Sequence, residues 1–145
     1  MADNSDPAAE LQRTWDLAAK DSDAAMALFY ETLFDTAPEV RKLFSGVPMK
    51  DQGRKLAAAI GLVVKSPQLP ESITGKLEEL GARHVVYGVE DRHYDAVGAA
   101  LLQTLETALG DEFTASAREA WVGAYAAVSS HMKAGAARSG VLAAE

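Results

Sequence analysis

Apolar side chains recur with the period of an α-helix in every patterned segment of this chain, and no segment alternates as a half-buried strand does. The pattern is clearest where Met26, Phe29, Tyr30, Leu33 and Phe34 stand at positions i, i+3, i+4, i+7 and i+8. Because these positions share one face of a helix, the segment is predicted to be an amphipathic helix packed into a core. The fold class is therefore predicted to be all-α.

Prolines, glycines and capping residues separate the predicted helices. The expected starts are Asp6-Pro7, Asp21-Ser22-Asp23, a capping box at Thr36-Ala37-Pro38-Glu39, about Lys50, the segment beginning near Ile73, about His93 and Thr114. Tyr87-Gly88 and Gly110 are the expected ends of two of these helices. After Lys133 the composition changes to Ala, Gly and Ser, so residues 134–145 are predicted to form a flexible tail on a single domain of residues 1–145.

Composition excludes several classes of site. The 145 residues contain no cysteine, which excludes disulfides, thiolate metal sites, iron–sulfur clusters and covalently attached haem of the CxxCH kind. Fourteen Lys and Arg residues stand against 21 Asp and Glu residues, and they form no basic block, so nucleic acid is not an expected partner. A metal in this chain must therefore be bound by histidine or carboxylate.

Neither a membrane span nor a secretory signal is expected. The longest apolar run, residues 56–64, has nine residues, about half of what a bilayer requires. The N-terminus is acidic and polar and has no apolar stretch. The expected location is cytoplasmic.

Three polar side chains interrupt the apolar stripes: Tyr30, Gln52 and His84. Each has a plain structural interpretation, since a core tyrosine can reach the surface with its hydroxyl, a first-turn glutamine can be solvated, and a core histidine can be hydrogen-bonded. Because they lie on three helices that share one core, a joint role is favoured. Haem iron needs one neutral imidazole, an apolar slot and hydrogen-bond donors opposite the imidazole, and these residues match that need.

Several stretches resemble the globins, specifically bacterial single-domain haemoglobins, flavohaemoglobin haem domains and neuroglobin-like bacterial globins. The resemblance covers roughly residues 8–133 and is carried mainly by residues 28–34, 38–44, 52–56, 81–89, 93–98 and 121–125. It implies a three-over-three helical sandwich around a non-covalent haem b. It also implies O2, NO and CO as ligands, with the chain a monomer or weak homodimer.

The resemblance assigns a role to individual residues. His84 takes the place of the proximal iron ligand, and Tyr30 and Gln52 take the place of the distal donors to O2. The remaining positions implied to contact haem are Phe44 as the stacking ring, Leu56, Leu80, Val89, Tyr94 and Val97 as lining residues, and Lys55 and Arg83 as propionate partners.

One position departs from the family pattern. Flavohaemoglobins hydrogen-bond the proximal imidazole within a tyrosine and glutamate pair. Tyr94 is present here, but an ungapped comparison places Ala136 where the glutamate belongs, and Glu145 is the only acid further on. The second nitrogen of His84 is therefore expected to bond a backbone carbonyl near Leu80.

Three functions follow as alternatives. The first is reversible binding of O2, and the second is nitric oxide dioxygenation, which needs electrons from a separate reductase because no dinucleotide-binding motif is present. The third is a sensor or a haem-free signalling module. It is disfavoured because a module without haem would not need Tyr30, Gln52 and His84 to converge. Whether the protein is an enzyme, and which gas matters, is not decided by the residues.

Overall fold

The computed structural model describes residues 6–66 and 68–144, and over these residues it contains helices and turns without a strand. The α-helices are α1 (Pro7–Ala18), α2 (Ser22–Thr36), α3 (Met49–Lys65), α4 (Glu71–Tyr87), α5 (Asp91–Leu109) and α6 (Ala115–Ala144). Short 3-10 helices form η2 (Ala19–Asp21), η3 (Pro38–Phe44) and η4 (Gly110–Glu112). The predicted all-α class is confirmed.

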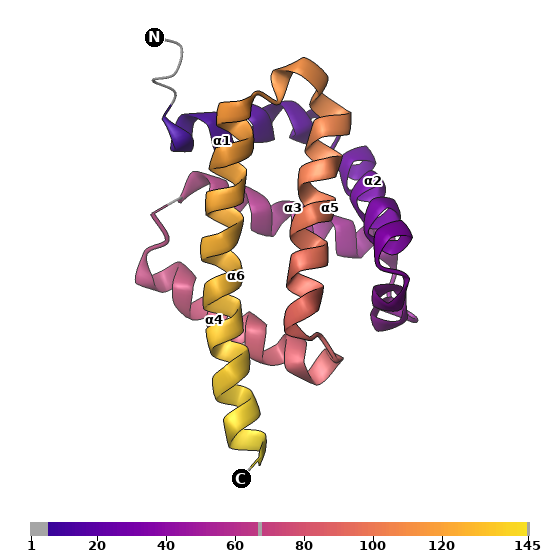
Figure 1. The fold of residues 1–145 in the computed structure, drawn as a ribbon, viewed down its shortest axis with the longest axis vertical. Helices are drawn as coiled ribbons and strands as arrows, with labels where there is room; N and C mark the ends of the chain where they lie inside the picture. The colour runs from indigo at the N-terminus through magenta and orange to yellow at the C-terminus, as the bar shows by residue number, and fades with distance from the viewer. Residues whose placement is uncertain (1–5, 67, 145) are drawn as a thin grey trace.

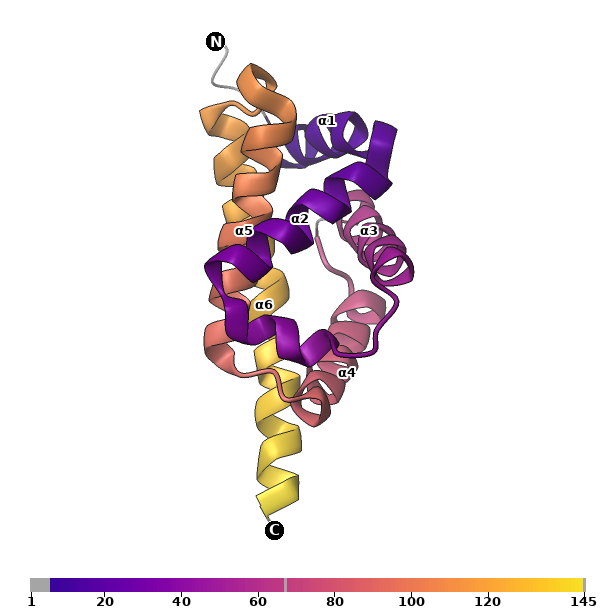
Figure 2. The same ribbon diagram turned by 90° about the vertical axis from the view of Figure 1, so that its right-hand side faces the viewer.

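The long helices α5 and α6 run along the long axis of the molecule, with α1 across one end and α3 and α4 crossing behind them (Figure 1). From the side, α2 crosses α5, while α3 and α4 follow one another along the opposite edge (Figure 2). The most extensive packing joins α4 to α6 and α2 to α5. This arrangement agrees with the globin fold that the resemblance implies. Among the described residues, no helix is long and apolar enough to span a membrane.

Two of the predicted caps are formed. Asp21 accepts a hydrogen bond from the Ala24 backbone N–H at 3.2 Å at the start of α2. Thr114 accepts one from the Ala117 N–H at 3.1 Å at the start of α6. Each satisfies a donor that the first turn of a helix leaves unpaired. Asp6 stands at the N-cap of α1 without a side-chain bond, and Pro7 takes the first helical position.

The predicted capping box at Thr36 is wrong. α2 continues through Thr36, whose hydroxyl donates to the backbone carbonyls of Thr32 and Leu33 at 2.9 and 3.3 Å. Ala37 therefore occupies the N-cap of η3 without any side-chain bond. A threonine can bond backward to its own helix as readily as forward to the next, and spacing alone does not distinguish the two.

α6 does not end where the composition changes. It continues as helix to Ala144, and the segment after Lys133 packs on α4 through Gly135, where an added Cβ would overlap the Glu78 carbonyl. Gly81 on α4 makes the matching close approach to the Met132 backbone. Glycine at both positions allows the two helices to cross with their backbones in contact. Flexibility of residues 134–145 stays a prediction.

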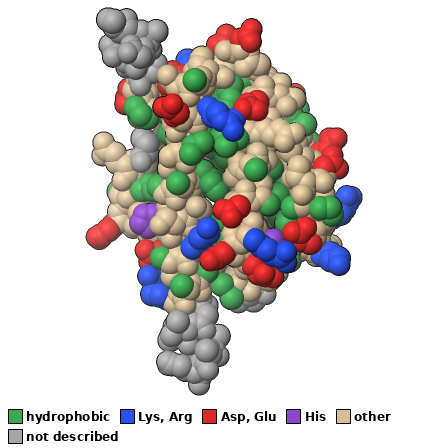
Figure 3. All heavy atoms as spheres, viewed as in Figure 1, with side chains coloured by type: hydrophobic (Ala, Val, Ile, Leu, Met, Phe, Trp, Pro, Cys, Tyr) green, Lys and Arg blue, Asp and Glu red, His purple; other side chains and the backbone are tan. Residues whose placement is uncertain are grey.

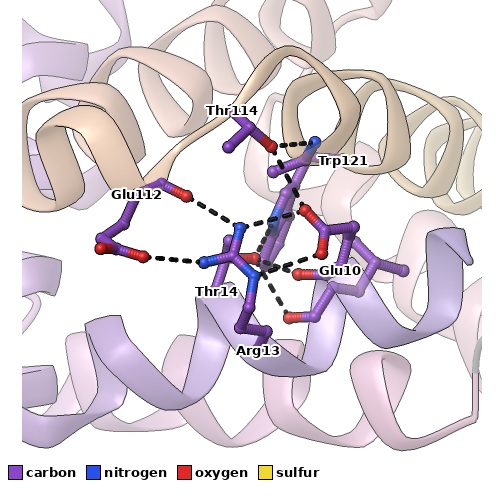
Figure 4. Close-up of polar contacts among 8 residues, drawn as sticks. Glu10, Arg13, Thr14, Glu112, Thr114 and Trp121 are labelled. Atoms are coloured by element: carbon purple, nitrogen blue, oxygen red, sulfur yellow. Dashed lines mark hydrogen bonds and ion pairs between the residues drawn. The ribbon is translucent and has the colours of Figure 1, made fainter. Parts of the chain in front are cut away.

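A complete polar network ties α1 to α6 (Figure 4). The indole N–H of Trp121 donates to the Thr14 hydroxyl at 2.7 Å, and that hydroxyl donates to the Glu10 carbonyl at 2.6 Å. Arg13 extends the network by pairing with the Glu10 and Glu112 carboxylates at 3.0 and 3.1 Å. The buried polar groups at this end of the core are therefore all satisfied.

Candidate functional site

His84 lies one turn before the end of α4 and is half-buried. Burial, the largest cause, lowers the pKa of His84 from its ordinary value of 6.5, and the nearby Arg83 guanidinium lowers it further. The Leu80 carbonyl acts in the opposite direction because it favours the protonated ring. The outcome is an imidazole that is neutral at pH 7, as a metal ligand must be.

The Nδ1 atom of His84 is buried and has no hydrogen-bond partner. The effect of the Leu80 carbonyl on the His84 pKa supports the predicted contact between the imidazole and this carbonyl, although the contact does not have the full geometry of a hydrogen bond at Nδ1. Helix geometry places the carbonyl four residues earlier beside the ring, but the side-chain direction decides whether a hydrogen bond forms.

Tyr30 and Gln52 come together from α2 and α3. Tyr30 is 7% exposed, and burial raises the pKa of its phenol, while the neighbouring Gln52 side chain lowers it by a smaller amount. Gly53, next to Gln52, makes this approach possible, because an added Cβ there would lie 3.1 Å from the Cβ of Met26. The two predicted distal donors are thus neighbours.

Aromatic rings surround the Tyr30 phenol on α2 and η3. Its ring centroid lies 4.9 Å from that of Phe29, 5.9 Å from Phe34 and 5.4 Å from Phe44. The edge-on contacts with Phe29 and Phe44 are favourable arrangements of aromatic rings. They restrict the ring orientation, so the hydroxyl has a defined position beside Gln52.

The other predicted lining residues divide between two apolar clusters. Phe44, Leu56 and Val97 are half-buried against the larger one, which is built on α1, α2, α5 and α6. Leu80 and Val89 pack with the buried Tyr94 in the smaller one, under α4. Lys55 and Arg83 are exposed. The apolar residues predicted to contact haem are therefore half-buried or buried, and the two charged ones lie at the surface.

Tyr94 is the second residue with an unsatisfied polar atom. It is 6% exposed, and its hydroxyl is buried without a hydrogen-bond partner. Burial raises the pKa of this phenol, and the Asp91 carboxylate adds a smaller rise. Among the described residues, His84 Nδ1 and the Tyr94 hydroxyl oxygen are the buried side-chain nitrogen and oxygen atoms that lack a partner. Both belong to residues that the resemblance places on the proximal side.

Two residues that contact Tyr94 had no predicted role in the site. The hydroxyl of Tyr125 donates to the Tyr94 backbone carbonyl at 2.5 Å, and its ring lies against Gly98, where an added Cβ would be 2.7 Å away. The Lys133 ammonium lies 5.6 Å from the Tyr94 ring centroid. Tyr125 was visible only as one inward position of the last helix, and pairing it with Gly98 requires the α5–α6 contact.

The other two histidines have different environments. His93 is 5% exposed, and its Nδ1 accepts the Glu90 backbone N–H at 2.9 Å, which completes a capping box at the start of α5. His131 has a side chain that is 38% exposed and lies 3.9 Å from the Glu78 carboxylate. His93 therefore caps the start of α5.

The residues of the site fit a haem group better than a directly bound metal ion. No group of three or more His, Asp or Glu side chains able to hold a metal occurs in the described part of the chain. A neutral buried imidazole with one unpartnered nitrogen, two apolar clusters and a separate phenol–amide pair are instead available. These are the groups needed to hold a flat apolar cofactor through one axial ligand.

Comparison with known proteins gives a family match over most of the chain. The Globin family model matches residues 27–132, a range that includes every predicted site residue. The protein named Anaerobic nitrite reductase NSHB5 of Oryza sativa subsp. indica is 30% identical over 132 residues, covering 83% of this chain and 90% of that protein.

Two further relatives cover different shares of their own length. Neuroglobin of Tetraodon nigroviridis is 27% identical over 143 residues, covering 90% of both proteins. A protein named Flavohemoprotein, from Vibrio cholerae, is 31% identical over 99 residues, covering 67% of this chain but only 25% of the relative. This chain therefore corresponds to about a quarter of the flavohemoprotein.

Proposed function

Since the chain belongs to the globin family, we propose that it holds haem b without a covalent bond and reversibly binds O2, with NO and CO as further ligands. The observation that carries this proposal is the neutral, half-buried imidazole of His84 on α4, together with the Tyr30 and Gln52 side chains that meet from α2 and α3. The Tyr94 hydroxyl adds support, because buried polar atoms are nearly always paired in folded proteins and this one lacks a partner among the described residues.

His84 is the proposed proximal ligand. Its pKa lies below the ordinary value because of burial, so the ring offers a free lone pair at neutral pH without losing a proton first. When bound, haem supplies a ferrous iron at which a diatomic gas can bind. Phe44, Leu56, Leu80, Val89, Tyr94 and Val97 are the proposed apolar contacts, and the exposed Lys55 and Arg83 are the proposed partners of its carboxylates.

Tyr30 and Gln52 are the proposed donors on the opposite side. A phenol and an amide can each donate a hydrogen bond to O2 that carries partial negative charge. Each such bond to a charged acceptor contributes on the order of 1.5–3 kcal/mol. About 1.4 kcal/mol corresponds to a tenfold change in affinity, so the pair can set the O2 affinity over one or two orders of magnitude.

Nitric oxide dioxygenation is the second candidate, favoured by similarity to the flavohemoprotein over 67% of this chain. In that reaction NO, O2 and one electron yield nitrate, and the electron must be replaced by a separate reductase. Two observations argue against a strongly electron-donating proximal imidazole. The Tyr94 hydroxyl has no carboxylate partner among the described residues, and Ala136 occupies the position implied for the glutamate. Reversible binding therefore ranks first.

Absorption spectra test the proposal directly. The purified protein is expected to show a Soret band that shifts on reduction by dithionite and again when CO is added. A protein that takes up no haem in this measurement would contradict the proposal. The rate of NO consumption under air with a supplied reductant then distinguishes reversible O2 binding from nitric oxide dioxygenation. Turnover no faster than the single reaction of the oxygenated protein with NO would exclude the enzymatic function.

A further inference from the structure

The helices η3 and α3 carry an excess of exposed cations, together called the basic face below, on a chain that is acidic as a whole. These cations are Arg41, Lys42, Lys50, Arg54, Lys55 and Lys65, and all six are exposed. The same two helices carry two carboxylates, Glu39 and Asp51, whereas the whole chain has 21 acids against 14 Lys and Arg residues. The excess of positive charge is therefore local.

Most of these cations are not neutralised within the protein. Among the described residues, only Arg54 of the basic face forms an ion pair, with Asp23 at 3.5 Å, and both side chains are about half exposed. Arg41 lies 5.5 Å from the Phe34 ring centroid. The other five cations of the basic face have no ion-pair partner among the described residues.

Three of the α3 cations lie on one side of the helix. At about 100° per residue, Lys50, Arg54 and Lys65 fall within about 60° of one another around the helix axis. No charged residue lies between Lys55 and Lys65, so Lys65 stands about three turns from Arg54. All three side chains are exposed, and α3 lies at the edge of the molecule in Figure 2. The charges can therefore act together on one partner.

The face formed by α5 and α6 has a different charge pattern. On the face formed by α5 and α6, acidic and basic side chains are interspersed (Figure 3). Several of them are paired, as Arg118 is with Glu106 and Arg138 with Glu78. An acidic partner therefore meets less opposing charge on η3 and α3 than on the face formed by α5 and α6.

The basic face and the candidate site share the same two helices. η3 carries Phe44, and α3 carries Gln52 and Leu56, which are half-buried toward the core while the cations are exposed. A helix with its side chains is about 10 Å across, so a partner seated on α3 would be separated from the site by little more than one helix. Transfer of a single electron requires such proximity.

We infer that the basic face docks an acidic protein that delivers single electrons to this chain. This inference rests on the proposed function, in which iron that has become ferric must be reduced again. One electron leaves the reduced flavin or iron–sulfur centre of the partner, and the ferric iron gains it to become ferrous; no bond forms or breaks. Contacts of this kind are small and short-lived, and their association rate depends on complementary charge.

The charge of the whole chain favours a protein partner over other polyanions. A nucleic acid or an anionic membrane extends beyond the basic face and meets the acidic remainder of the chain, which opposes binding. A small protein with one acidic patch meets only the basic face. Nucleic acid and membrane are therefore the alternatives that the experiment must separate.

Reduced flavodoxin, a small acidic one-electron donor, is the probe for a stopped-flow test. The holoprotein in its ferric form is mixed with flavodoxin hydroquinone, and the rate of reduction is followed in the Soret band. The face variant Lys50→Glu/Lys65→Glu is compared with the control Lys20→Glu/Lys76→Glu, which changes the net charge equally at exposed positions of η2 and α4. Lys55 is left unchanged because it is a proposed haem contact.

At low ionic strength the face variant is expected to be reduced about tenfold more slowly, because removing complementary charge lowers the association rate. The control is expected to stay within about twofold, and the difference should shrink as salt is added. Reduction by dithionite should be equal in all three proteins. The inference would be overturned if flavodoxin reduced both variants equally slowly, or if it reduced both as fast as the unchanged protein.

A binding measurement completes the test without relying on turnover. Oxidised flavodoxin is titrated into the ferric protein, with a DNA oligonucleotide and phosphatidylserine vesicles as separate arms. Face-dependent binding of flavodoxin alone supports an electron-donor protein, and tighter face-dependent binding of either other probe would overturn it. A protein without a Soret band would contradict both the proposed function and this inference. Normal O2 binding with no difference between the face variant and the control would contradict this inference alone.

Discussion

The two ends of the core treat their buried polar groups differently. Where α1 meets α6, the Trp121 indole and the Thr14 hydroxyl are bonded at 2.7 Å, and the same hydroxyl donates onward to a carbonyl. Where α4 meets α5 and α6, His84 Nδ1 and the Tyr94 hydroxyl are buried without partners. At the first end the buried polar groups are hydrogen-bonded, as in a purely structural contact. At the second end two buried polar atoms are not.

The difference shows how a small helical protein can separate stability from function. A satisfied network rigidifies its surroundings, whereas an unsatisfied buried atom costs free energy unless another group completes it. Changes at the α1–α6 end should therefore alter stability, and changes at the α4 end should alter what the protein binds. Four predictions test this separation.

Replacing His84 with alanine should have the largest effect. Haem affinity is expected to fall about a hundredfold or more, since even residues that merely support a metal ligand contribute about 10–100-fold. The free energy of unfolding of the haem-free protein should barely fall, because an unsatisfied buried nitrogen is removed. Haem titration and urea unfolding measure the two quantities.

His131→Ala is the matched control, since that side chain lies at the surface beside Glu78. It should leave haem affinity unchanged. An unchanged Soret band in the His84 variant, or an equal loss of haem affinity in both variants, would contradict the proposal that His84 at the α4 end determines haem binding.

Replacing Tyr30 with phenylalanine should have the next largest effect. Loss of a donor to a partly charged ligand is expected to speed O2 dissociation about 10- to 100-fold. Stopped-flow measurement of the dissociation rate checks this, with the exposed Tyr87→Phe as control. A dissociation rate that matches the control would take Tyr30 out of the distal role.

Replacing Thr14 with valine tests the α1–α6 end. The Trp121 N–H would be left buried without an acceptor, so the free energy of unfolding should fall by about 1–3 kcal/mol. O2 affinity should stay the same. Thr36→Val is the control, because Thr36 is exposed and its hydroxyl bonds to carbonyls of its own helix without accepting a hydrogen bond from another helix in the described part of the chain. A changed O2 affinity in the Thr14 variant would show that the two ends are coupled.

The smallest expected effect is a pH dependence centred on His84. Burial holds the pKa of the folded-state ring below the ordinary value of 6.5, so the unfolded chain binds its proton first as pH falls. The free energy of unfolding of the haem-free protein should therefore be largest above pH 6.5 and should decrease as pH falls below 6.5. Urea unfolding across this range, compared with His84→Gln, measures the contribution, and an identical slope in both proteins would exclude His84 as its source.

Much of the helical framework follows from the order of the residues. The apolar stripes, the Asp21 and Thr114 caps and the end of α4 at Gly88, whose φ is +96°, were all predicted from positions within one or two turns. Where the prediction was wrong, as at Thr36, two local hydrogen-bonding arrangements compete, and the length of α2 decides between them.

Some residues of the candidate site could be predicted from the sequence, and others could not. Tyr30, Gln52 and His84 stand out because each interrupts an apolar stripe, and the structure brings Tyr30 and Gln52 together. Their roles toward haem stay predictions. The contact of Tyr125 with Tyr94 could not be predicted, because residues 31 positions apart meet only when α5 and α6 pack.

By itself, the sequence determined the all-α class, the division into helices and the residues that stand out as chemically active, because these depend on spacing and side-chain chemistry. Only the tertiary structure decided that His84 and Tyr94 keep unsatisfied buried atoms and that Thr14 and Trp121 do not. It also decided that the cations of η3 and α3 are exposed and that Arg54 alone among them forms an ion pair in the described part of the chain. These properties depend on the crossing of distant helices, which no local pattern specifies.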